Sequence, residues 1–144
     1  MTPDLQQLVA ALREELKHYG EMLALLEQQQ QTVQSRAADQ AFAATGAIHR
    51  QAEAILEARR NSDARRRALA RELRQDESSS VPQLMPLIPP QYRPLLKSLV
   101  EENAALFQSV QRAARDNHEF LTRSVESMQR FLKLLFPGGQ PVAA

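Results

Sequence analysis

The distribution of proline constrains this chain more than any other feature. Five of the eight prolines fall within DESSSVPQLMPLIPPQYRP, residues 76–94, and none lies between Asp4 and Val81 or between Leu95 and Phe136. Proline lacks an amide hydrogen and its ring clashes with the preceding helical turn, so it interrupts helices. The chain therefore divides into two long proline-free arms and a connector, which we place at residues 76–90.

The composition favours helices and excludes several classes of protein. Leu, Ala, Gln, Glu and Arg dominate, and only four of the 144 residues are glycine, which is typical of a mostly helical protein. There is no cysteine, so disulfides and thiolate chemistry are excluded. The first residues do not resemble a signal peptide, and no window approaches the ~20 apolar residues of a membrane span. We expect a cytoplasmic, soluble protein without stable membrane insertion.

The first arm carries a heptad-like apolar seam. Its members recur at steps of three and four, with Gln30 in the one missing place: Leu5, Leu8, Leu12, Leu16, Tyr19, Leu23, Leu26 and Val33. This spacing predicts an amphipathic helix over about residues 4–37. The pattern slips around SRAADQAFAATG, where a second helix over about 39–75 can begin. A single bent helix through Arg74 is the alternative.

The second arm predicts a third helix over about residues 91–135, ended by Pro137 and two glycines. Its seam includes Asn103 and Asn117, fourteen residues apart at the same heptad position. A buried Asn in a helical seam usually fixes register at a cost in stability, so we assign both a structural role and expect that replacing both with Leu raises thermal stability. A contact with the backbone of a partner is the alternative.

The fold class that follows is all-α. We predict an elongated, antiparallel, three-helix, coiled-coil-like bundle that forms a single domain over residues 1–136, with residues 137–144 as a flexible tail. The alternative is one long bent helix that forms a hairpin with a second long helix.

The end of the third helix is the best candidate for a binding surface. A first helix of residues 4–37 would be ~51 Å long and residues 91–135 would span ~68 Å, so roughly ten residues would extend past the bundle. This end is strongly apolar on one face, which normally marks a partner site. The predicted partner-binding residues are Phe120, Leu121, Val125, Met128, Phe131, Leu132, Leu135 and Phe136. The alternative is that residues 128–136 pack on the turn near Phe42.

An arginine-rich stretch, EARRNSDARRRALARELR, offers a second interpretation. Seven arginines lie between Arg59 and Arg74, and Arg60, Arg67, Arg71 and Arg74 recur at helical spacing, as a phosphate-binding stripe would require. The stretch contains no aromatic residues that could stack on bases, and the net charge of the chain is only +1. We therefore favour a solvated helix face and expect no nucleic-acid partner.

Nothing in the sequence indicates catalysis. His18, His49 and His118 are isolated from one another, and no glycine-rich phosphate loop or nucleophile elbow is present. We therefore predict a protein that is not an enzyme and that has no catalytic residues, cofactor or metal site.

The arrangement of these segments resembles the FlgN family of flagellar type III export chaperones. The similarity includes a Leu-rich first helix that ends in LALLEQQQQTV, a second helix rich in Ala, Leu and Arg, a polar break, and a third helix that ends in DNHEFLTRSVESMQRFLKLL. This last piece is similar to the family pattern of an Asn, a paired apolar position (Phe120 and Leu121) and a Leu-rich amphipathic end.

The resemblance implies a cytoplasmic chaperone that binds the C-terminal amphipathic helices of hook-filament junction proteins, prevents their premature assembly and delivers them for export. It also places export-gate and export ATPase components among the candidate partners. Helix-in-groove binding uses anchors three, four and seven residues apart, and the end of the third helix supplies such spacings. The alternatives are a self-associating structural coiled coil and, less favoured, a helical nucleic-acid-binding protein that uses the arginine stretch.

Overall fold

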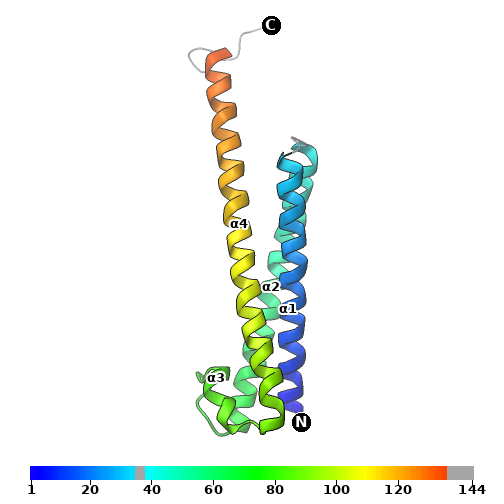
Figure 1. Cartoon of the computed structure of the whole chain (residues 1–144), viewed down its shortest axis with the longest axis vertical. Helices are drawn as coiled ribbons and strands as arrows, with labels where there is room; N and C mark the ends of the chain where they lie inside the picture. The colour runs from blue at the N-terminus through cyan, green and yellow to red at the C-terminus, as the bar shows by residue number, and fades with distance from the viewer. Residues whose placement is uncertain (35–37, 136–144) are drawn as a thin grey trace.

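The computed structural model describes residues 1–34 and 38–135, and these are almost entirely helical. Three long helices, α1 (Pro3–Gln34), α2 (Ala38–Glu72) and α4 (Arg93–Leu135), run side by side along an elongated molecule (Figure 1). The short helix α3 (Val81–Leu84) and two 3-10 turns, η1 (Met85–Leu87) and η2 (Pro90–Tyr92), lie at the end where α4 begins. The all-α bundle predicted from the sequence is confirmed.

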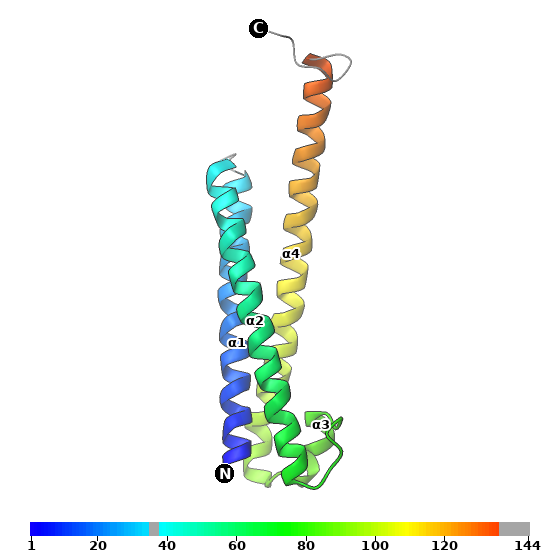
Figure 2. The same ribbon diagram turned by 180° about the vertical axis from the view of Figure 1, so that it is seen from behind.

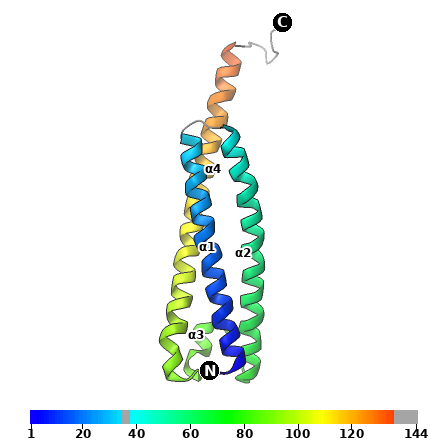
Figure 3. The same ribbon diagram turned by 90° about the vertical axis from the view of Figure 1, so that its right-hand side faces the viewer.

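Helix α1 is the central element, because it packs against both α2 and α4. Figure 3 shows α1 in front, with α4 and α2 on either side. The chain runs up α1, down α2 and up α4, so α1 and α4 are parallel and both are antiparallel to α2. Since α1 and α2 pack against each other along the bundle, the alternative of a single bent helix through Arg74 is wrong.

The apolar seams meet in a core at the base of the bundle, which we call the base core. All three long helices and the connector contribute to it, and every member is less than a tenth exposed. Its members are Leu5, Leu8, Val9, Leu12, Leu69, Ala70, Val81, Leu84, Ile88, Leu96 and Leu99. Burying a side chain of this size stabilises the fold by roughly 1.5 to 3 kcal/mol, so the base core is the main source of the fold's stability.

A second group, the upper core, continues the packing toward the middle of the molecule. It consists of Tyr19, Met22, Leu26, Ile55 and Val110, with half-buried neighbours around them. The hydroxyl of Tyr19 donates a hydrogen bond to Glu15 Oε1 at 2.8 Å, and its ring lies 5.7 Å from the ring of Phe107. Burial, together with the neighbouring Glu15 carboxylate, raises the pKa of Tyr19 far above its ordinary value, so this phenol stays neutral and serves as a donor.

The connector contains short helical elements and contributes to the base core. Within the predicted connector 76–90 the chain forms α3, η1 and the start of η2, and Val81, Leu84 and Ile88 enter the base core. Ser80 caps α3: its Oγ accepts from the Gln83 amide at 3.3 Å, and the Ser80 amide donates to Gln83 Oε1 at 2.8 Å. This reciprocal capping box explains why so short a helix is stable.

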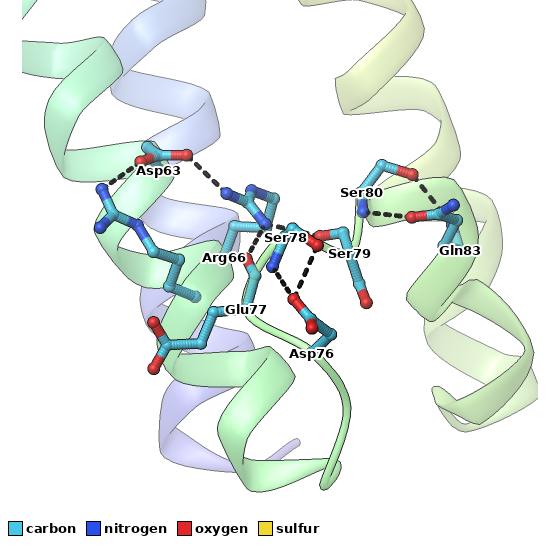
Figure 4. Close-up of polar contacts among 9 residues, drawn as sticks. Asp63, Arg66, Asp76, Glu77, Ser78, Ser79, Ser80 and Gln83 are labelled. Carbon is cyan, nitrogen blue, oxygen red and sulfur yellow. Dashed lines mark hydrogen bonds and ion pairs between the residues drawn. The ribbon is translucent and has the colours of Figure 1, made fainter.

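Arg66 of α2 holds the loop that precedes α3 (Figure 4). Its Nη1 donates to the carbonyls of Glu77 at 2.7 Å and Ser79 at 2.6 Å, while its Nη2 donates to Asp63 Oδ1 at 2.7 Å. Hydrogen bonds from Arg66 and Arg67 hold the pKa of the Asp63 carboxyl below its ordinary value. One arginine thus links the last third of α2 to the connector.

The predicted ends of two helices need correction. Helix α2 ends at Glu72 rather than near 75, because Arg74 adopts a left-handed conformation with φ of 56°. The amide of Gln75 then donates to the Ala70 carbonyl at 2.8 Å and that of Arg74 to the Arg71 carbonyl at 3.0 Å, which is a Schellman ending with arginine in the position that usually holds glycine. Helix α4 starts at Arg93 rather than 91, since Pro90–Tyr92 form a 3-10 turn. The first helix is described only to Gln34, so its predicted last three residues lie outside the described residues.

Helices α1 and α4 are held in parallel by two matched hydrogen bonds. The side-chain amide of Asn103 donates to the Leu12 carbonyl at 3.0 Å, and that of Asn117 donates to the Leu26 carbonyl at 2.8 Å. Both asparagines are buried, and both pairs are separated by 91 residues. The two helices therefore keep the same alignment over two heptads, as a register role for these asparagines requires.

Candidate functional site

Helix α4 extends past the end of the α1–α2 hairpin (Figure 2). It has 43 residues against 32 in α1, a difference of eleven. Adding the separation of 91 residues to Gln34, the last residue of α1, gives position 125 of α4. Because each residue adds about 1.5 Å to a helix, the final ten residues of α4 extend roughly 15 Å past α1.

We call residues 118–135 the distal segment of α4. It begins just after Asn117, whose side chain is tied to α1 through the Leu26 carbonyl and, at 3.2 Å, through Gln29 Oε1. Phe120, three residues later, is 39 % exposed. Exposed apolar surface thus begins within one helical turn of Asn117, although Leu121 is still half-buried.

The described side chains at the end of the distal segment are open to solvent. Leu132 is 45 % exposed and Leu135 is 51 % exposed, whereas Leu121 is half-buried. Among the described residues, Leu132 and Leu135 are too exposed to belong to a core formed with the α1–α2 hairpin. The backbone of Val125, Met128 and Phe131 belongs to α4, but their side chains lie outside the described part, as does all of Phe136.

The sequence analysis missed the most exposed leucine of the surface. Leu134 is 81 % exposed, but it lies off the predicted stripe and was left out. The signal was the high apolar content of FLKLLF, residues 131–136, in which Lys133 is the one charged residue and leucines occupy more than one face of the helix. The end of α4 therefore offers a wider apolar surface than a single stripe.

Charged residues of both signs accompany these apolar side chains. Arg123 and Glu119 form an exposed pair one turn apart, with an N–O distance of 3.8 Å. Arg130 and Lys133 contribute positive charge farther along and Glu126 contributes negative charge. A mixed polar face of this kind does not select an acidic membrane surface.

The arginine stretch of α2 is largely engaged within the chain. Arg65 donates to Gln7 Oε1 at 2.6 Å and Arg71 to Glu77 Oε1 at 2.9 Å, while Arg67 joins Arg66 on Asp63. The guanidinium of Arg59 lies 4.4 Å from the centre of the Phe107 ring. The favoured interpretation as a fully solvated face was incomplete, because these side chains also link α2 to α1, α4 and the connector.

Isolated polar groups elsewhere supply no second candidate. His18 lies on α1 between Glu14 at 3.3 Å and Glu21 at 3.6 Å. Across residues 1–34 and 38–135, no group of three or more His, Cys, Asp or Glu side chains is arranged to hold a metal ion. Within the same residues, none of the helices combines the length and apolar character needed to cross a membrane.

Comparison with known proteins adds one positive finding. The family model described as FlgN protein matches residues 1–143, which is almost the whole chain. No curated protein matches the chain, and no solved structure does.

Proposed function

The chain belongs to the FlgN family of flagellar export chaperones, and from this premise we propose that its distal segment binds the C-terminal amphipathic helices of hook-filament junction proteins. The chaperone would hold these proteins in the cytoplasm, prevent their premature assembly and deliver them to the export apparatus. The observation that carries the proposal is the apolar end of α4, which extends past the hairpin with Leu132, Leu134 and Leu135 about half exposed or more.

The shape of the distal segment supports a helical cargo. A free apolar helix can pair with an amphipathic helix along its length, using side chains three, four and seven residues apart as anchors. The predicted anchors Leu121, Val125, Met128, Leu132 and Leu135 have these spacings. A cargo helix that becomes ordered only when bound would lose part of the binding free energy to ordering, which favours later release.

The test is co-elution of the intact chain with C-terminal segments of hook-filament junction proteins on size exclusion. We expect a one-to-one complex that is lost when the chain is truncated after Arg130 and weakened at least tenfold by Leu132→Asp with Leu135→Asp. Leu87→Asp is the matched control, because Leu87 is 48 % exposed in η1, at the opposite end of the molecule. This control is expected to bind as the wild type does.

A second double variant separates binding from folding. Phe131→Asp with Leu135→Asp should leave helical content and melting temperature near those of the wild type; a sharp fall in either would show that these residues belong to the core and would overturn the proposal. If the intact chain fails to bind cargo but associates with itself through the distal segment, the structural coiled coil becomes the better function. Binding to nucleic acid that falls steeply with salt would favour the arginine stretch instead.

A further inference from the structure

The bundle carries, beside the base core, a hollow that the proposed chaperone function does not use. It is an open depression of about 490 Å³, a size usual for ligand sites. Its lining combines an apolar floor with charged walls from α1, α2 and the first residue of α3: Leu8, Leu12, Glu15, Leu56, Arg59, Arg60, Ser62, Asp63, Arg66, Arg67 and Val81. We call it the arginine-lined hollow.

The hollow is elongated along the helix axes. On α2 it extends from Leu56 to Arg67, a run of eleven residue steps or about 16 Å of helix. Val81 lines it as well, and the Arg59 guanidinium over the Phe107 ring joins α2 to α4 beside it. An occupant that follows the α2 wall must therefore be extended or helical rather than compact.

The charge of the lining is positive. Four arginines face two carboxylates, Glu15 and Asp63. Glu15 accepts the Tyr19 hydroxyl and lies 4.0 Å from Arg59 Nε, and Asp63 is shared by Arg66 and Arg67. The lining therefore keeps an excess of two positive charges, and a partner with acidic groups at its flanks would complement it.

The wall of the hollow carries an exposed apolar side chain and a buried hydroxyl without a described partner. Leu56 is 53 % exposed on α2, although its neighbours along the wall are charged. Among the described residues, the buried hydroxyl of Ser62 finds no hydrogen-bond partner, and a buried polar group without a partner costs roughly 1 to 3 kcal/mol. A ligand that covers Leu56 would remove this apolar surface from water, whereas the Ser62 hydroxyl is too deeply buried to be reached unless the wall rearranges.

The connector already packs an apolar segment of the chain at one edge of the hollow, where Val81 lines it. Helix α3 inserts Val81 and Leu84 into the base core, while Arg66 donates to the carbonyls of Glu77 and Ser79 just before it. The apolar side chains of this segment are thus buried in the base core, while Arg66 of α2 binds the backbone carbonyls of the loop before it. We propose that the arginine-lined hollow binds a three-turn amphipathic helix of a protein partner, with leucine-like side chains over Leu56 and acidic side chains on Arg60 and its neighbours.

This surface is distinct from the distal segment of α4, so the chain would have two helix-binding sites. The contact covers about three helical turns, far less than a standard protein interface, so we expect micromolar affinity. Such a site suits a partner that is bound briefly and exchanged.

The experiment uses a fluorescein-labelled 18-residue peptide with leucines three and four residues apart and glutamates beside them, titrated with the full chain by fluorescence anisotropy. Two control peptides have lysine in place of every glutamate, or the same composition with the leucine spacing scrambled. We expect the Leu/Glu peptide to bind at least about tenfold more tightly than either control, since both charge and apolar spacing contribute.

Matched variants then locate the site. Arg60→Glu and Leu56→Asp should each weaken binding about fivefold or more, whereas Arg112→Glu and Leu87→Asp, at exposed positions elsewhere, should leave it within twofold. Circular dichroism checks that each variant remains helical. Three results would overturn the proposal. The first is that both hollow variants bind the Leu/Glu peptide as the wild type does, and the second is that the scrambled peptide binds as tightly as the Leu/Glu peptide. The third is that a single-stranded oligonucleotide binds as tightly as the Leu/Glu peptide and loses this binding in Arg60→Glu.

Truncation after Arg130 distinguishes the two sites. Peptide binding should survive this truncation, even though cargo binding at the distal segment should not. Loss of peptide binding on truncation would place the peptide on α4 and refute the hollow as its site, without affecting the proposed chaperone function.

Discussion

The base of the bundle and the distal segment of α4 have similar apolar content but opposite surroundings. At the base, α1, α2 and α4 meet and α3 adds Val81 and Leu84, so leucines such as Leu8 and Leu96 are fully buried. At the other end α4 is alone, and Leu134 is 81 % exposed. The comparison teaches that apolar helical sequence specifies a core only where other elements are present to cover it.

The largest expected difference is in the cost of removing a leucine. Leu8→Ala should destabilise the fold by about 3 kcal/mol, because it leaves a cavity in the base core. Leu134→Ala, the same change on exposed surface, should stay within about 0.5 kcal/mol. Urea unfolding followed by far-UV circular dichroism measures both. If the two substitutions lowered the free energy of unfolding equally, the base core and the distal segment would not differ in their contribution to stability.

The connector is the next point at which the comparison can be tested. Arg66→Ala removes three hydrogen bonds that hold the loop before α3, and we expect a loss of about 1 to 2 kcal/mol of unfolding free energy. The control is Arg65→Ala, which removes one exposed hydrogen bond to Gln7 and should cost less than about 0.5 kcal/mol. If the two variants have equal free energies of unfolding, the hydrogen bonds of Arg66 do not stabilise the base of the bundle.

The two asparagines allow a comparison within the part of α4 that packs on α1, between a position near the base and a position near the distal segment. Asn103 lies near the base, and its Oδ1 is buried without a partner among the described residues, so Asn103→Leu should raise stability by about 1 kcal/mol. Asn117 also donates to the buried Gln29 Oε1. Asn117→Leu should therefore change the free energy of unfolding by less than about 0.5 kcal/mol. Replacing both should still raise the melting temperature, and a large drop in the double variant would refute the register assignment.

The smallest expected effect is a pH dependence at the base. The pKa of Asp63 is lower in the folded chain than the ordinary value of 3.8, because Arg66 and Arg67 donate hydrogen bonds to its carboxylate. Its contribution to stability is therefore complete above the unfolded pKa and is lost as pH falls through the lower folded value. Asp63→Asn should cost less than about 1 kcal/mol at pH 7, since the carboxylate is partly exposed, and this difference should shrink below about pH 4. A difference that persists at pH 2 would contradict this origin.

Sequence was sufficient for the features that depend on local chemistry. The proline-free arms predicted the long helices. The seam spacing predicted the buried residues Leu5, Leu8, Leu12, Tyr19 and Leu26 of α1 and Asn103 and Asn117 of α4. The length difference between the helices predicted that α4 would extend past the hairpin. Each of these follows from residue spacing and segment length along the sequence.

Three features were missed, two of them local and one dependent on contacts between distant segments. The capping box of Ser80 and Gln83 was visible in the sequence, but the polar and proline-rich surroundings led us to interpret residues 76–90 as a plain connector. The role of Arg66 depends on carbonyls brought to it by the turn of the chain after α2. The left-handed conformation of Arg74 was likewise invisible, because arginine does not favour it.

The attachment of α4 through Asn117 gives the distal segment the mechanical character of a lever. Ten residues, 126–135, extend past the end of α1, an arm of about 15 Å. A bend of about 10° at the base of this arm would carry Leu135 through about 3 Å. Such a bend would move the exposed end of α4 while the buried contacts between α1 and α4 stay in place.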